Sequence, residues 1–427
     1  LLSFWYRMAG DTLTSYRLFS VLMFLLTLPF LYGLSRQLFG SKKAGLIAVS
    51  LFSISPFIHY FAQEARYYML WVLLITVIHY FLIKAIHLKH NKWWAGYILF
   101  GVLSLYGSAL SGFILFEHLL FVFFIKKELR VKFLIILGII GLMYLPWFYF
   151  VYTFREQVYI SLSWHKYNEV TYWAPLLGFV LGLVRIFSFY QNYTLFWDDV
   201  FNNITTAMII ETFFNVLILA LIVISVVVML KKEKKETAWF VLLILIPGLI
   251  FFWGLDIIRN AITTHWWRYY IFNTLPVVLL VAYLINKYID LKKTLFITIY
   301  LCLSGIGIYS IVTISKYKYW YIGGNWIDEF VDNAELLSKA ENPLMVSDFK
   351  RLNNTWTGPM HSMVILANCT SPNIDVLRVS TQVEDFKELI AHGHYSDIFV
   401  INASDSLLVN LKQHFENKLT ILPGRKG

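Results

Sequence analysis

The chain has 427 residues and a mean hydropathy of +0.62; 58% of the residues are hydrophobic, 18% are aromatic and only 15% are charged. Because soluble domains are about half apolar and about a quarter charged, this composition excludes an ordinary soluble globular protein over most of the length. The formal net charge of +10 would suit a protein that binds nucleic acid. The basic residues, however, lie where a membrane protein places them, so we expect membrane lipids as partners and no nucleic acid.

Apolar blocks long enough to cross a bilayer follow one another along the first three quarters of the chain. A membrane-spanning helix needs about 20 predominantly apolar residues. The blocks that meet this need lie at 18–36, 44–61, 68–86, 94–110, 112–126, 133–152, 207–230, 238–256, 270–286 and 295–313. The sequence therefore predicts an all-α polytopic membrane protein with about ten transmembrane helices.

Lysine and arginine are concentrated in alternate connectors between these spans. The basic connectors contain Arg36, Lys42, Lys43, Lys84, Lys89, Lys92, Lys126, Lys127, Arg130, Lys132, Lys231, Lys232, Lys234, Lys235, Lys287, Lys292 and Lys293. The other connectors hold far fewer basic residues, namely Arg66, Arg155, Lys166, Arg259 and Arg268. Since basic loops stay in the cytoplasm, the first set is predicted to be cytoplasmic and the second to face the periplasm or the cell exterior.

One apolar segment, 173–190, does not fit this alternation. If it crossed the membrane, the basic run KKEKKE at 231–236 would move to the outer face. We therefore expect an interfacial or re-entrant helix in an outer loop. An ordinary span that violates the charge rule is the alternative.

The character of the sequence changes after residue 314. Short β-like runs, such as NPLMVSDF, MVILANC, IDVLRV, DIFVIN and KLTILP, alternate with the amphipathic stretches WIDEFVDNAELLSKA and VEDFKELIAHG. The sequence thus predicts a membrane domain at 1–314 and a small C-terminal α/β extramembrane domain at 315–427 on the outer side. Neither glycine-rich nucleotide-binding pattern occurs, so packing or acceptor docking is the expected role of this domain.

The hexapeptide QEARYY at 63–68 places Glu64 and Arg66 in a very short outer loop, beside His59 and Tyr67. Charges near membrane spans are costly and therefore tend to be paired or functional. Arginine suits phosphate because its planar fork donates two parallel hydrogen bonds. Arg66 is thus a candidate phosphate ligand, and Glu64 would orient it or contact a sugar. Mutual neutralisation at a helix turn is the equal alternative.

A second outer cluster lies in THWWRYYIFNTLP at 264–276, where His265, Arg268 and Tyr269 precede a span. Arg268 would add a second cation at the same depth and complete an anion clamp. The alternative is an interfacial anchor, because tryptophan, tyrosine and arginine commonly populate that region.

Two further polar features rank lower. The aromatic segment 145–173 contains His165, Lys166 and Glu169, which are low-ranked candidates for contact with substrate. Its aromatic residues could stack on a sugar or an isoprenoid chain, but the favoured interpretation of each is that it lies at the membrane interface. Glu117 and His118 are adjacent within an apolar block, so they do not share a helix face. Pairing with a neighbouring helix is the favoured interpretation for these two residues.

The landmarks YRLFS, RQLFG, SISP, YFAQEARYY, YLPWF and RYYIFNTLP follow one another in the first 315 residues. In composition and order they resemble the GT-C membrane glycosyltransferases, especially the family 39 protein mannosyltransferases and their aminoarabinose-transferring relatives. The resemblance implies a multi-pass protein of the cell membrane, in a bacterium the inner membrane, that uses a polyprenyl-phosphate sugar as donor. The acceptor would be a lipid, a glycan or a protein.

The resemblance also implies an inverting displacement in which an acidic residue activates the acceptor and basic residues hold the departing phosphate. Arg66 and Arg268 match the basic positions, and Glu64, His59, Tyr67, His265 and Tyr269 are the expected sugar or substrate contacts. The family's catalytic aspartate follows its first span, and we expect that acid upstream of Leu1, so the catalytic residue is unknown. No metal site is predicted, and the sequence leaves open whether a divalent cation assists.

Two other classes of function compete with the enzyme. A transporter or flippase for lipid-linked sugars should show internal repeats and broken helices near the membrane midplane, and we predict neither from the sequence. A non-catalytic membrane scaffold that displays the C-terminal domain is the third interpretation.

Overall fold

The computed structural model describes residues 2–10, 12–64, 66–155, 174–188, 206–259, 263–265, 267–316, 339–348, 375–379, 397–401 and 409. The chain forms two compact units, Leu1–Lys318 and Tyr319–Gly427. The boundary predicted at residue 314 lies within α16 (Lys293–Lys316), the last helix of the first unit.

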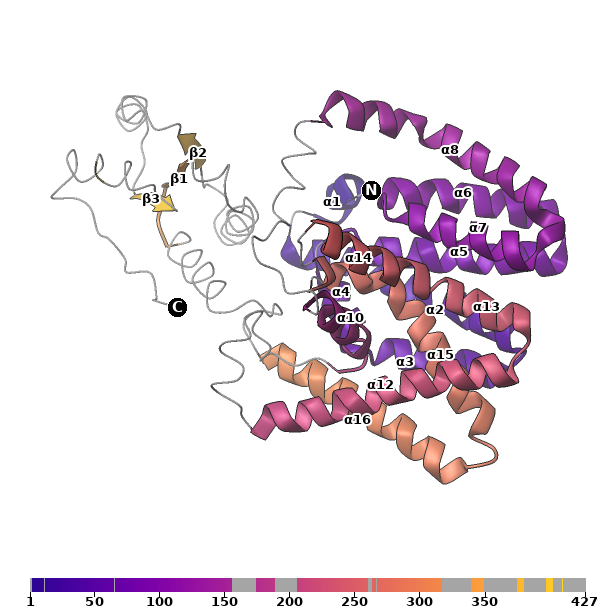
Figure 1. Cartoon of the computed structure of the whole chain (residues 1–427). Coiled ribbons are helices and arrows are strands. Elements are labelled where there is room, and N and C mark those ends of the chain that lie inside the picture. Colours follow the sequence, from indigo (N-terminus) through magenta and orange to yellow (C-terminus); the bar gives the residue numbers. More distant parts are fainter. Residues whose placement is uncertain are drawn as a thin grey trace. The chain divides into compact units, whose positions relative to one another are not determined.

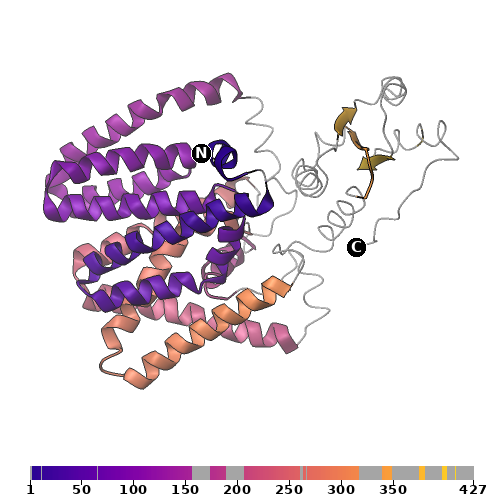
Figure 2. The same cartoon turned by 180° about the vertical axis from the view of Figure 1, so that it is seen from behind.

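The first unit is helical throughout its described part (Figure 1). Its other α-helices are α1 (Leu2–Ala9), α2 (Leu13–Phe39), α3 (Lys42–Ser53), α4 (Pro56–Gln63), α5 (Tyr68–Leu88), α6 (Asn91–Gly107), α7 (Ser111–Ile125), α8 (Arg130–Thr153), α10 (Ala174–Val184), α12 (Thr206–Lys232), α13 (Lys235–Leu243), α14 (Ile246–Arg259) and α15 (Thr274–Tyr288). Short 3-10 helices are η1 (Lys127–Leu129), η3 (Thr263–His265) and η4 (Trp267–Asn273). α2 and α3, coloured indigo, lie on the near side of this unit in the reverse view (Figure 2).

Seven described helices are long and apolar enough to cross a membrane, or eight if the bent pair α3–α4 counts as one span. This confirms the prediction of an all-α polytopic membrane protein. A helix or helix pair lies at each of the predicted spans, but α6 and α7 have only 17 and 15 residues. At about 1.5 Å per residue they are shorter than the roughly 30 Å hydrocarbon core. The count of about ten spans therefore stays a prediction.

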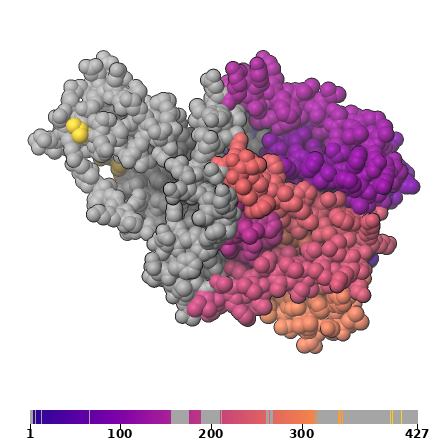
Figure 3. All heavy atoms as spheres, viewed as in Figure 1, coloured from indigo at the N-terminus to yellow at the C-terminus, as the bar shows by residue number. Residues whose placement is uncertain are grey.

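The candidate spans differ in how deeply they are buried. Of the apolar stretch of each span, 89% is buried for α15 with η4 but only 17% for α8 and 22% for α16. Figure 1 shows α8 at one edge of the helical unit and α16 at the opposite edge. In the space-filling view of the same side, α6–α8 and α12–α14 make up most of the described surface (Figure 3). Apolar side chains exposed on such peripheral helices suit contact with lipid.

The span formed by α3 and α4 is broken, with a bend of 61°. The sequence explains the break, because Ser55 caps α4 by accepting a hydrogen bond from Ile58 N and Pro56 occupies the first turn. The break frees the carbonyl of Ser53, which lies within hydrogen-bond distance, 2.7 Å, of His59 Nε2. The sequence-based prediction that no helix is broken was therefore wrong, since a serine–proline pair ends one helix and begins another within a continuous apolar block.

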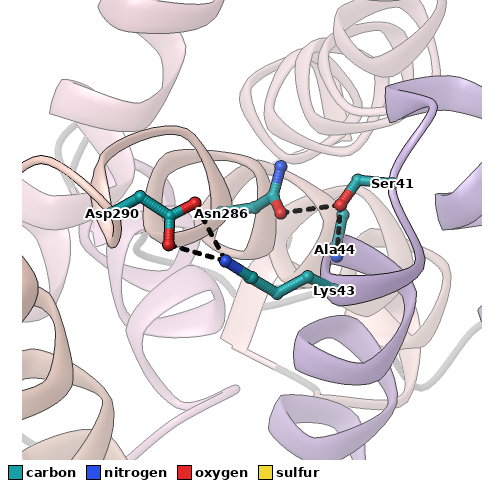
Figure 4. Close-up of polar contacts among 5 residues, drawn as sticks. All are labelled: Ser41, Lys43, Ala44, Asn286 and Asp290. Atoms are coloured by element: carbon teal, nitrogen blue, oxygen red, sulfur yellow. Dashed lines mark hydrogen bonds and ion pairs between the residues drawn. The ribbon is translucent and has the colours of Figure 1, made fainter.

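Connectors of the basic set contact one another at one end of the helical unit. Lys43 Nζ lies 2.7 Å from Asp290 Oδ1, and Ser41 Oγ lies 2.9 Å from Asn286 Oδ1 (Figure 4). These contacts tie the start of α3 to the end of α15. In the same set of connectors, Lys126 Nζ on the α7–η1 turn pairs at 2.6 Å with a carboxylate oxygen of α13. This end is called the basic end below.

The described part of the second unit contains a parallel three-stranded sheet with strand order β2–β1–β3. The strands are β1 (Pro343–Asp348), β2 (Asp375–Val379) and β3 (Asp397–Ile401). They coincide with three of the five predicted β-like runs; the other two runs and both amphipathic stretches lie outside the described residues. The α/β domain as a whole stays a prediction.

Candidate functional site

The turn between α4 and α5 carries Glu64 and Arg66, and it is anchored to α2. The buried hydroxyl of Ser20 donates a 2.7 Å hydrogen bond to the carbonyl of Glu64. The same carbonyl accepts a 2.8 Å hydrogen bond from the backbone N–H of Arg66. These bonds satisfy the backbone at the point where α4 ends, so the turn stays short and its charged side chains remain close to the helix ends.

Glu64 and Arg66 form an ion pair of unequal exposure. Arg66 Nε lies 3.2 Å from Glu64 Oε1, and the side chains are 52% and 21% exposed respectively. The second carboxylate oxygen of Glu64 is buried and has no hydrogen-bond partner among the described residues. The pair therefore leaves part of the Arg66 guanidinium exposed, and it leaves one buried acceptor atom of Glu64 without a partner among the described residues.

Burial dominates the electrostatics of this turn. It raises the pKa of Glu64, and the positive charges of Arg66 and Arg268 oppose that rise. For Arg66, burial lowers the pKa, but the charge of Glu64 and the contact with Tyr68 outweigh it, so the pKa of the guanidinium is raised. Arg66 thus stays charged, whereas Glu64 is held closer to its neutral form than an exposed glutamate.

Arg268 comes from a distant part of the sequence and lies at the start of η4. Its guanidinium carbon is 5.3 Å from the centroid of the Tyr269 ring, and that ring packs at 5.3 Å on Phe252. Burial, together with Tyr68, raises the pKa of Tyr67 to about 12, while the charge of Arg268 acts in the opposite direction. Because Arg268 acts on both Tyr67 and Glu64, the structure brings the two outer clusters into electrostatic range of each other.

Of the two candidate histidines, the structure places only the side chain of His59, and it points into the α3–α4 break. The Nε2 of His59 is engaged with the Ser53 carbonyl inside the α3–α4 break, and its ring lies 5.9 Å from that of Phe24. The side chain of His265 lies outside the described part of the structure, although its backbone belongs to η3. His59 therefore supports the broken span, and the role of His265 stays a prediction.

Asp256 is the residue near this site that sequence reasoning missed. It lies fully buried in the last turns of α14 and accepts hydrogen bonds from Thr263 N at 2.8 Å, Thr264 N at 2.7 Å and Thr264 Oγ1 at 2.7 Å. A lone carboxylate inside an apolar block is costly, and this signal could have singled it out. Asp256 holds η3, and η4 with Arg268 follows directly.

The short helix α10 lies in the loop predicted to contain an interfacial helix. It has 11 residues, about 16 Å, too short to cross a bilayer as one helix. The residues at its end, including Val184, Ile186 and Phe187, are buried, and Ser55 Oγ donates a 2.6 Å hydrogen bond to the carbonyl of Ile186. This bond links the loop to the α3–α4 break. The lower-ranked His165, Lys166 and Glu169 lie outside the described residues.

Glu117 and His118 are both fully buried in α7. His118 Nε2 lies 2.7 Å from His79 Nδ1 on α5, and its Nδ1 lies 2.9 Å from the hydroxyl of Tyr97 on α6. The predicted pairing with neighbouring helices is therefore confirmed for His118. Glu117 lies beside Gly248 in the first turn of α14, where a Cβ would come within 3.4 Å of Glu117 Oε1.

Among the described residues, no group of three or more histidine, cysteine, aspartate or glutamate side chains is arranged to hold a metal ion. The described residues do place Arg66 in an ion pair with Glu64, with Arg268 close enough to act on the same carboxyl through its charge, at the ends of candidate membrane helices. A donor phosphate and a sugar hydroxyl both match this set of groups.

Comparison with known families agrees with this chemistry. Residues 1–150 match the family of dolichyl-phosphate-mannose-protein mannosyltransferases, a stretch that includes Glu64 and Arg66 but not Asp256 or Arg268. A comparison with curated proteins gives no match. The matched family consists of membrane glycosyltransferases of the GT-C type, and the described helices include seven candidate membrane spans. Over residues 1–150 the chain is therefore similar to GT-C mannosyltransferases, and its candidate spans are those of a multi-pass membrane protein.

Proposed function

We propose that this glycosyltransferase takes its sugar from a polyprenyl-phosphate donor and transfers it to a lipid, glycan or protein acceptor on the outer face of the membrane. The observation that carries the proposal is the grouping of Arg66 and Arg268 around the buried carboxylate of Glu64. Both arginines lie at the helix ends opposite the basic end, where a lipid-linked phosphate resides while its tail stays among the helices.

In this proposal the two arginines bind the donor phosphate and stabilise the charge that grows on it as the sugar departs. Guanidinium groups suit this task because they donate paired hydrogen bonds to phosphate and remain charged. Arg66 is half-exposed, so part of its guanidinium can reach a ligand while the pair with Glu64 is kept. The unpartnered oxygen of Glu64 accepts a hydroxyl of the sugar, and Tyr67 and Tyr269 contact its ring. His265 and His59 are the remaining proposed substrate contacts, although His59 must first leave Ser53.

The general base that activates the acceptor is not assigned to a residue. The displacement inverts the anomeric centre, with the acceptor oxygen forming the new bond while the phosphate leaves with the old bonding pair. A divalent cation, if one assists, would bind with the donor phosphate. The C-terminal unit is proposed to be an α/β domain on the outer side that docks the acceptor, and the cell membrane, in a bacterium the inner one, is the proposed location.

A transporter of lipid-linked sugars is the second candidate, and the broken span α3–α4 favours it because broken helices mark transporter sites. Against it, the carbonyl freed at the break is already engaged by His59, and Ser55 caps the following half-helix. The Ser53 carbonyl and the backbone N–H of Ile58 at the break are thus both engaged within the protein. A scaffold without activity has no observation in its favour.

The test uses the full chain in lipid nanodiscs with a panel of polyprenyl-phosphate sugars, and it measures the release of polyprenyl phosphate. Charged hydrogen bonds contribute about 1.5–3 kcal/mol each. We therefore expect Arg66→Ala and Arg268→Ala each to lower the rate tenfold or more. Lys43→Ala, a cation at the basic end, is the matched control and should leave the rate unchanged.

Wild-type rates in both arginine variants would refute the phosphate clamp. Movement of the labelled sugar lipid across vesicle membranes without release of polyprenyl phosphate would instead support the transporter. Absence of both activities in the wild type, with the C-terminal unit still capturing an acceptor, would favour the scaffold.

A further inference from the structure

Asp256 is a buried acid that neither the proposed clamp nor the matched family segment includes. It is the only acidic residue of α14, and it lies near the end of that helix. Both of its carboxylate oxygens accept hydrogen bonds, Oδ1 from Thr263 N and Oδ2 from the N–H and hydroxyl of Thr264. These three hydrogen bonds fix the start of η3 against α14.

The fixed point is close to Arg268 along the chain. Arg268 follows Thr264 by four residues, and η4, which contains it, continues directly into α15. η3 packs on α10 and α14, and η4 packs on α5, α10 and α15. The arginine is therefore held from two sides, by the deeply buried α15 after it and by Asp256 before it.

The geometry separates two roles that a buried carboxylate near a site could have. A general base needs an oxygen free to receive a proton from the acceptor. In Asp256 both oxygens are occupied by donors of the same segment, and the side chain is fully buried. Its hydrogen bonds run to two backbone N–H groups and one hydroxyl of the loop, which is the arrangement of a group that orients its neighbours.

We propose that Asp256 is a positioning residue for Arg268: by binding Thr263 and Thr264 it sets the course of η4, so that the Arg268 guanidinium faces Glu64 and the donor phosphate. The inference rests on the proposed function. It adds a residue that does not touch the phosphate and whose removal acts on phosphate binding through Arg268, as in other sites where supporting contacts hold a binding group in place.

The test measures the dissociation constant of farnesyl phosphate for the full chain in nanodiscs, with farnesol as the probe that lacks the phosphate. We expect Asp256→Ala to weaken binding of farnesyl phosphate about tenfold, as Arg268→Ala does, and to leave farnesol binding unchanged. Combining the two substitutions should weaken binding no further than Arg268→Ala alone, because they remove one interaction.

Three variants guard against a general loss of structure. Asp256→Asn keeps the size of the side chain but presents an NH₂ group to the donors, and it should resemble Asp256→Ala. Thr264→Val removes one of the bonds and should weaken binding by about two- to threefold. Glu117→Gln changes another buried acid, which does not bind η3, and should bind farnesyl phosphate like the wild type.

The outcomes separate the inference from the proposal beneath it. If Arg268→Ala weakens binding but Asp256→Ala and Thr264→Val do not, the positioning role is wrong and the phosphate clamp stands. If the effects of Asp256→Ala and Arg268→Ala multiply in the double variant, Asp256 does not act through Arg268. If the wild type binds farnesyl phosphate no better than farnesol, the clamp fails, and the positioning role fails with it.

Discussion

The two ends of the helical unit hold their charges in different ways. At the basic end, the paired side chains of Lys43 and Asp290 are 48% and 78% exposed. At the other end Asp256 is fully buried, and Glu64 keeps one carboxylate oxygen buried without a hydrogen-bond partner among the described residues. Among the described residues, each end thus has a glutamate with one buried carboxylate oxygen that lacks a hydrogen-bond partner, Glu236 at the basic end and Glu64 at the other, but only the second end has a fully buried carboxylate, that of Asp256.

This difference teaches which charges carry information about function. An exposed ion pair contributes little to stability, because water screens it and long side chains lose freedom when they pair. Its residues record orientation in the membrane. A buried charge costs free energy unless it is bonded, so a chain that retains one needs it for the fold or for a ligand. The end with Glu64, Arg66, Asp256 and Arg268 is accordingly the end where substitutions should affect transfer most, beginning with the two arginines.

The next largest effect on transfer and stability is expected at two serines, each of which holds a different connector, one at each end of the helical unit. Ser20 Oγ donates to the Glu64 carbonyl at 2.7 Å, and Ser41 Oγ caps α3 by accepting from Ala44 N at 3.2 Å. Each substitution by alanine should lower stability by about 1 kcal/mol. Only Ser20→Ala should also slow transfer, by about three- to tenfold, because it loosens the turn that carries Arg66.

Thermal unfolding in detergent and transfer rates in nanodiscs measure the two effects separately. Equal stability losses with a rate loss in Ser20→Ala alone would sharpen the contrast between the ends. Equal rate losses in both variants would break it, since a connector at the basic end would then support the site as well.

A smaller effect should appear as a pH dependence of stability. Burial raises the pKa of Glu64 above its ordinary value, and Arg66 and Arg268 oppose the rise. A glutamate with a raised pKa in the folded state contributes stability that is complete below the unfolded pKa, about 4.3, and is lost as pH rises through the folded value. The wild type should therefore lose thermal stability relative to Glu64→Gln as pH rises through that window, while the two proteins match at lower pH.

Thermal unfolding of both proteins across a pH series checks this expectation. The substitution leaves Arg66 without its carboxylate partner, but that side chain is half-exposed and water can solvate it. A difference that stays constant with pH, or one in which the wild type gains stability as pH rises, would show that the attraction of the arginines outweighs burial.

How far the sequence could predict this structure depends on whether a feature is repeated or single. Long apolar blocks predict helices because each block needs the same length to cross a bilayer. The α3–α4 break rests on one serine–proline pair and on its contact with His59, so block hydropathy missed it. The basic connectors reveal a common side but not which of them touch, as Lys43 and Asp290 do across distant helices.

The residues of the candidate site also fall into those that the sequence could select and one that it could not. Charge and position made Glu64, Arg66 and Arg268 candidates, and the family resemblance favoured a functional role for them over charge neutralisation or interfacial anchoring; that role stays a prediction. Asp256 was missed, since its meaning depends on a loop that folds back to it and on donors that the sequence does not place in contact. Local chemistry selects a charged residue; the fold decides whether a ligand, a loop or another side chain satisfies it.

The smallest effect concerns the ion pair between Lys43 and Asp290. Its atoms are 2.7 Å apart, but both side chains are substantially exposed, so each single substitution by alanine should change stability by less than about 1 kcal/mol. Raising the salt concentration from low to about 1 M shortens the screening length to about 3 Å and should remove most of even that difference. At each salt concentration, both variants should transfer sugar at the wild-type rate. A loss of stability above about 2 kcal/mol that persists in high salt would mean that the pair holds α3 and α15 together. The two ends of the helical unit would then differ in the exposure of their charges but not in the free energy that those charges contribute.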